Sequence, residues 1–95
     1  MINTETAPAT PRFNYLTRLI NRARQTEAEG NSHTAIRLYF QLMEEHFGAP
    51  EAAQARECLL GMARQYEDDG LHHQADDLFN RLMSFDKWAE EIEAA

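Results

Sequence analysis

Apolar residues recur every three or four positions in four successive segments of this chain, and no segment alternates with a period of two. A helix start is predicted at Thr10-Pro11, where a hydroxyl N-cap precedes a proline at the first helical position. Glycines end the first three segments, and Pro50 opens the third. The pattern predicts an all-α fold, in which short turns force neighbouring helices to lie antiparallel.

The spacing of Phe85, Trp88 and Ile92 predicts a short C-terminal helix after the four main ones. We expect the chain to divide into a flexible leader at 1–10 and a single helical domain at 11–95. Within that domain we expect repeat one at about 11–48, repeat two at about 50–84 and the terminal helix at about 85–94.

The sequence also repeats itself at an offset of 40 residues. Residues 19–43 align with 59–83 without a gap, and 11 of the 25 positions are identical, where average composition gives roughly one or two. The identical pairs are Leu19/Leu59, Ala23/Ala63, Arg24/Arg64, Gln25/Gln65, Glu27/Glu67, Gly30/Gly70, His33/His73, Ala35/Ala75, Leu38/Leu78, Leu42/Leu82 and Met43/Met83. A helix, a glycine turn and a second helix are therefore duplicated.

This repeated unit resembles the tetratricopeptide repeat (TPR) family, in which a leucine, a small residue and an aromatic on the first helix precede an alanine and an aromatic on the second. Repeat two carries them in order as Leu59, Ala63, Tyr66, Ala75 and Phe79. Repeat one carries Leu19, Ala23, Ala35 and Tyr39, with Thr26 where the first-helix aromatic would stand. The alanines are small where the two helices of a pair approach closely. The resemblance implies antiparallel helix-turn-helix repeats; a compact four- or five-helix bundle is the alternative.

The resemblance also implies a concave groove lined by the first helix of each repeat. Its partner-facing positions would be Thr17, Ile20, Asn21, Arg24 and Glu27 in repeat one, and Glu57, Leu60, Gly61, Arg64 and Asp68 in repeat two. Two equivalent arginines, Arg24 and Arg64, could clamp a carboxylate or phosphate of an acidic peptide. An undiverged duplication and an ordinary surface pair between Arg64 and Asp68 explain the same residues without a ligand.

Two repeats are fewer than the three that usually bury a continuous solenoid core. The terminal helix could cap the stack, or a second copy of the chain could cover its open face as a homodimer. Charge favours pairing of unlike ends, because residues 1–50 sum to zero whereas residues 51–95 carry the entire net charge of −7. That acidity also argues against a membrane or nucleic-acid partner, and against DNA binding through Arg12, Arg18, Arg22 and Arg24.

Catalytic and cofactor motifs are absent from the sequence, so we expect no cofactor and no enzyme. His72 and His73 precede Asp76 and Asp77 at i,i+4, a spacing that can hold a metal. A metal-binding or catalytic protein using His33, His72 and His73 with nearby acids is therefore the alternative function. The favoured one is a non-catalytic adaptor, scaffold or chaperone that binds a partner peptide or helix, self-associates, or does both.

The chain has one cysteine, Cys58, which falls on an apolar stripe and is predicted to be a buried structural thiol. A lone cysteine suits a reducing compartment, and no apolar run follows positive charges near Met1. The expected location is the cytoplasm.

Overall fold

The computed structural model describes residues 11–94, and side chains from residue 15 onward. This part of the chain is all-helical, with four helices: α1 (Pro11–Ala28), α2 (Ser32–Glu45), α3 (Pro50–Asp68) and α4 (His72–Ala94). The all-α prediction is confirmed for these residues. The expected leader at 1–10 and the expected N-cap at Thr10 lie outside them.

The prediction of a separate C-terminal helix is wrong, because α4 continues without a break to Ala94. No glycine or proline interrupts the chain after Gly70, and Ser84 is tolerated inside a helix. The apolar positions of α4 also keep one unbroken spacing of three and four residues: Ala75, Leu78, Leu82, Phe85, Ala89 and Ile92. A stripe that never shifts gives the chain no reason to turn.

The glycine turns within the two repeats share one geometry. Gly30 and Gly70 adopt φ values of 87° and 80°, a left-handed conformation that glycine adopts without steric cost. The amide of Asn31 donates to the carbonyl of Thr26 at 3.1 Å, and the amide of Leu71 donates to that of Tyr66 at 2.8 Å. Together with the glycine amides, which donate to the carbonyls of the third residue before them, these bonds form a Schellman motif at each helix end.

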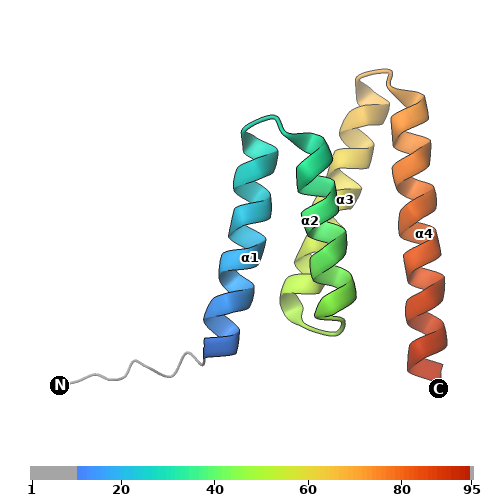
Figure 1. Ribbon diagram of the computed structural model, residues 1–95. Helices are drawn as coiled ribbons and strands as arrows, with labels where there is room; N and C mark the ends of the chain where they lie inside the picture. The colour runs from blue at the N-terminus through green and yellow to red at the C-terminus, as the bar shows by residue number, and fades with distance from the viewer. Residues whose placement is uncertain (1–10, 95) are drawn as a thin grey trace. The chain divides into compact units, whose positions relative to one another are not determined.

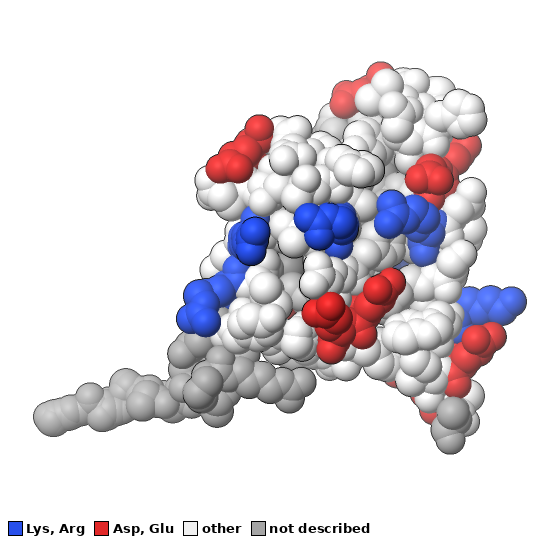
Figure 2. Space-filling model, in the orientation of Figure 1, with Lys and Arg blue, Asp and Glu red and all other residues white. Residues whose placement is uncertain are grey.

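The described chain falls into two compact units, the first ending at Ala55 and the second beginning at Arg56, so the boundary lies inside α3. In the first unit, α1 and α2 lie side by side and antiparallel (Figure 1). Its buried apolar residues are Leu16, Ile20, Ala23, Ala35, Tyr39, Phe40, Leu42, Met43, Ala52 and Ala55. Exposed arginines stand on the outer surfaces of α1 and α2 (Figure 2).

The second unit contains the rest of α3 and all of α4, joined at the Gly70 turn (Figure 1). Its buried residues are Leu59, Met62, Ala63, Ala75, Leu78 and Leu82. The guanidinium of Arg56 joins α3 to α4 through two hydrogen bonds to Asp86, with Nε–Oδ1 at 3.0 Å and Nη2–Oδ2 at 2.6 Å. The Asp86 carboxylate raises the pKa of Arg56 above its ordinary value through this pairing.

The alanines predicted at close helix approaches, Ala23, Ala35, Ala63 and Ala75, are all fully buried. Cys58 differs from its prediction, since it is only half-buried. It lies at the edge of the apolar stripe of α3, about 100° around the helix from the fully buried Leu59. No described helix is long and apolar enough to cross a membrane.

Candidate binding site

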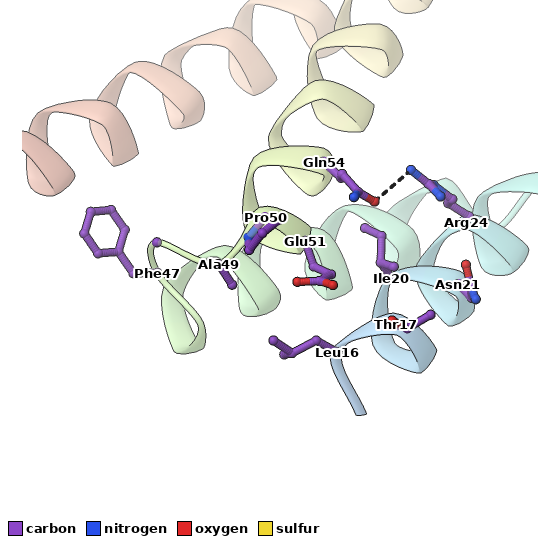
Figure 3. Close-up of a pocket in the computed structure, with 11 residues that line it drawn as sticks. Leu16, Thr17, Ile20, Asn21, Arg24, Phe47, Ala49, Pro50, Glu51 and Gln54 are labelled. Atoms are coloured by element: carbon purple, nitrogen blue, oxygen red, sulfur yellow. Dashed lines mark hydrogen bonds between the residues drawn. The ribbon is translucent and has the colours of Figure 1, made fainter. Parts of the chain in front are cut away.

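The first unit contains a cavity of about 750 Å³ between α1 and the start of α3. Its lining residues are Leu16, Thr17, Ile20, Asn21, Arg24, Phe47, Gly48, Ala49, Pro50, Glu51 and Gln54. We call it the first-unit pocket. Figure 3 shows side chains from α1 facing side chains from the loop before α3 and from its first turns.

Local backbone chemistry places the loop beside α1. Gly48 turns the chain after α2 with a φ of 91°, and Pro50 then starts α3. The carbonyl of His46 accepts the amide of Ala49 at 3.0 Å, and the carbonyl of Ala49 accepts the amide of Ala52 at 3.0 Å. These bonds fix the first turn of α3 and thereby the position of Glu51.

Part of the pocket wall is apolar, and polar side chains line the rest. Leu16 and Ile20, which are 5% and 2% exposed, contribute from α1. Ala49 and Pro50 contribute from the opposite side. Among the polar side chains, the guanidinium of Arg24 donates to Oε1 of Gln54 at 3.3 Å, a bond that joins α1 to α3 (Figure 3). Apolar walls with a few convergent polar groups are typical of sites that bind ligands.

Glu51 is the buried charged residue of the described chain, at 8% exposure. Its carboxylate points from the first turn of α3 into the space beside Leu16 (Figure 3). Among residues 15–94, no side chain or amide forms a hydrogen bond or ion pair with it. Burial of an unpaired carboxylate is costly, so this residue requires an explanation beyond packing.

The structure brings together four of the five partner-facing residues predicted in repeat one: Thr17, Ile20, Asn21 and Arg24 line the pocket. Glu27 lies further along α1, outside the lining, and accepts a hydrogen bond from the hydroxyl of Tyr39.

The residues predicted in repeat two belong to the second unit and do not line this pocket. Glu57, Gly61, Arg64 and Asp68 are exposed on α3, and Leu60 is half-buried.

The sequence analysis missed the opposite wall of the pocket, above all Glu51 and Gln54. A usable signal existed for Glu51, because the residue continues the apolar stripe of α3 one turn before Ala55 and two turns before Leu59. An acid on a core stripe is unusual enough to mark a candidate site.

Some of the repeated polar residues have structural contacts instead. Nε2 of Gln25 donates to Oε2 of Glu29 at 3.1 Å, and Nε2 of Gln65 donates to Oδ1 of Asp69 at 3.0 Å. Both bonds hold the end of a helix beside its glycine turn. Gln25 and Gln65 therefore make the same contact beside the glycine turn in both repeats.

A second, smaller hollow of about 300 Å³ lies on the other side of the α1–α2 hairpin. Its lining includes Tyr15, Leu19, Arg22 and Arg37. The ring of Tyr15 packs edge-on against His46 with centroids 5.8 Å apart.

The histidines proposed as metal ligands do not form a metal-binding set. Nδ1 of His72 lies 2.7 Å from Oε2 of Glu67, and both side chains are substantially exposed. Within the described residues, no three histidines, cysteines or acids are grouped closely enough to hold a metal ion. The i,i+4 pairs on α4 thus lack the further ligands that a metal site requires.

Comparisons with protein-family models, with curated proteins and with solved structures find no match for the chain.

Proposed function

We propose that this protein is a non-catalytic interaction module of two TPR-like helical repeats, which binds a segment of a partner protein in the first-unit pocket. The repeat interpretation is supported by the matching Schellman turns and by the four buried alanines at equivalent positions. It is also supported by the 40-residue offset that relates the two helix pairs.

One observation carries the binding proposal. The family resemblance alone, without knowledge of any cavity, predicts four partner-facing residues that all line the first-unit pocket: Thr17, Ile20, Asn21 and Arg24. At about 750 Å³ the pocket has the size of sites that hold a few side chains or a small ligand. Its position between two helices is also a common place for such sites.

The test is selection of binding peptides from a random dodecapeptide library, followed by affinity measurement with two matched variants. Asn21→Trp places a large side chain at the pocket, whereas Asn80→Trp makes the same change at an exposed position of α4. We expect Asn21→Trp to weaken the selected peptides about tenfold or more and Asn80→Trp to leave them unchanged. Equal binding by both variants would place the peptide elsewhere and refute the proposal.

Self-association is a second candidate function, favoured by a difference between equivalent residues. Met43 and Met83 occupy the same repeat position, yet Met43 is 1% exposed and Met83 is 62% exposed. Trp88 and Ile92, further along α4, are also exposed. Exposed large apolar side chains along one helix are typical of a surface that another molecule covers.

A further inference from the structure

We propose that the first-unit pocket receives a lysine or arginine side chain of the partner protein, with the carboxylate of Glu51 as its counter-ion. This inference rests on the proposed function, in which the same pocket binds a partner segment. It adds the chemical class of the group that enters.

The first argument is the state of Glu51 itself. Glu51 is 8% exposed. Within residues 15–94, nothing forms a hydrogen bond or ion pair with its carboxylate. A buried carboxylate without a hydrogen-bond partner lowers stability, and a cation that reaches it supplies the missing interaction. Because Glu51 itself is buried, that interaction is stronger than the same pair on the open surface.

The walls of the pocket fit the rest of such a side chain. Leu16, Ile20, Ala49 and Pro50 surround the approach to Glu51 with apolar atoms. Lysine and arginine have methylene stems that pack against apolar surface while the charged end makes polar contacts. A neutral apolar side chain would pack against the same residues but leave the carboxylate of Glu51 unpaired.

The alternative is an acidic group of the partner that binds to Arg24, and the surroundings of Arg24 make this less favourable. Its side chain is exposed, where solvent and salt screen its charge, and it already donates to Gln54. Residues 1–50, which supply all of the lining except Glu51 and Gln54, sum to zero charge, so they favour neither sign of ligand at long range. The buried carboxylate of Glu51 therefore decides the sign of the ligand.

A purely structural role of Glu51 at the start of α3 is the alternative explanation, and it makes different predictions from ligand binding. An acid in the first turn of α3 stabilises the helix N-terminus. An exposed carboxylate gains this stabilisation too, so the effect does not by itself account for the burial. A purely structural role predicts that removal of the charge changes stability and leaves ligand selectivity unaltered.

The experiment compares three probes that share one apolar chain: n-hexylammonium, hexan-1-ol and hexanoate. Their binding to the full-length protein is followed by NMR through the backbone amides of Ile20, Arg24 and Gln54. We expect n-hexylammonium to bind about tenfold more tightly than hexan-1-ol, as a charge-assisted bond to a carboxylate provides. We expect hexanoate to bind most weakly.

Two variants then test whether Glu51 is the residue that selects the ammonium over the alcohol. Glu51→Gln removes the charge with little change of shape, whereas Glu44→Gln removes one charge from an exposed position of α2 outside the pocket. In Glu51→Gln the preference for the ammonium over the alcohol is expected to fall to about twofold or less. In Glu44→Gln it is expected to stay as in the wild type.

The remaining outcomes separate this inference from the proposed function. Equal affinity of the wild type for the ammonium and the alcohol, or tighter binding of hexanoate, would overturn the basic ligand and leave a pocket that binds apolar groups. An ammonium preference that survives in Glu51→Gln would show that net charge, and not Glu51, selects the ligand. Failure of all three probes to perturb the pocket would overturn both the inference and the pocket as a binding site.

Discussion

The hydroxyl of Tyr39 donates a hydrogen bond of 2.6 Å to the carboxylate of Glu27 and so connects α2 to α1. Tyr39 is fully buried, and Glu27 is half-buried. The equivalent residues of the second repeat, Phe79 and Glu67, cannot make this bond because phenylalanine lacks the hydroxyl. Glu67 contacts His72 instead. The glutamate is thus identical in the two repeats while its contact has changed.

Replacement of Tyr39 by phenylalanine is expected to lower the free energy of unfolding by about 1–2 kcal/mol, because it removes a hydrogen bond to a charged group beside the core. Urea unfolding followed by circular dichroism measures the change. Tyr15→Phe is the control, since Tyr15 is 45% exposed and keeps its ring contact with His46. A Tyr39→Phe protein as stable as Tyr15→Phe would show that this bond contributes nothing net.

Two glycines of the second repeat are expected to respond in opposite directions to alanine. At Gly70 the φ of 80° is strained for alanine although a Cβ would meet no atom, so Gly70→Ala should cost about 1–2 kcal/mol. Gly61 lies inside α3 with equally open space, so Gly61→Ala should gain about 0.5–1 kcal/mol. Thermal unfolding of both variants checks the signs. A loss of stability in Gly61→Ala would mean that position 61 has a role that open helix surface does not explain.

Arg56 and Asp86 are expected to show a coupling free energy of about 0.5–1 kcal/mol in a double-mutant cycle with alanine. Although the pair is bidentate, the two side chains are 36% and 38% exposed, so solvent screens them. The coupling should decrease as salt is raised from about 0.05 M to about 1 M. Coupling that does not change with salt would argue against a screened ion pair.

The pH dependence of that pair follows from the raised pKa of Arg56. A raised folded-state pKa contributes stability that is fully present below the unfolded value and is lost only as the pH rises through the folded value. For an arginine that loss lies above about pH 12. The Arg56 contribution is therefore expected to stay constant from about pH 6 to about pH 10, and unfolding titrations of wild type and Arg56→Ala should run parallel there.

Much of the fold could be predicted from the sequence because local signals agreed with one another. Glycines that adopt positive φ, a proline at the start of α3 and unbroken apolar stripes specify helices and turns through contacts of a few residues. The predicted extent of α4 was wrong because the apolar residues Phe85, Trp88 and Ile92 were assigned to a helix of their own, although they lie on the helix that carries Ala75, Leu78 and Leu82. The unbroken apolar spacing from Ala75 to Ile92 predicts a single helix.

Only half of the candidate site could be predicted, for a physical reason. Thr17, Ile20, Asn21 and Arg24 share one face of a single helix, and helical spacing finds such residues. Glu51 and Gln54 reach the pocket through the loop after α2, whose path depends on tertiary packing. The place of Glu51 on the apolar stripe of α3 was a signal that the sequence did contain, but the contacts that bury the residue form only in the folded chain.

The exposed methionine of α4 gives a prediction about self-association. Met83→Glu is expected to abolish any dimer seen by sedimentation, because it introduces a charge where apolar contact is required. Ser84→Glu changes the adjacent exposed residue by the same charge and is expected to leave the dimer intact. A wild type that remains monomeric at tens of micromolar, a range common for weak pairs, would contradict self-association itself.

The central claim is that the partner binds in the first-unit pocket, and NMR mapping of a selected peptide on the full-length protein tests it most directly. We predict that the largest amide shifts fall at residues 16–24 and 47–54, which supply the two walls. Shifts confined to α4 around Met83, or spread over the chain without a cluster at these residues, would contradict the claim.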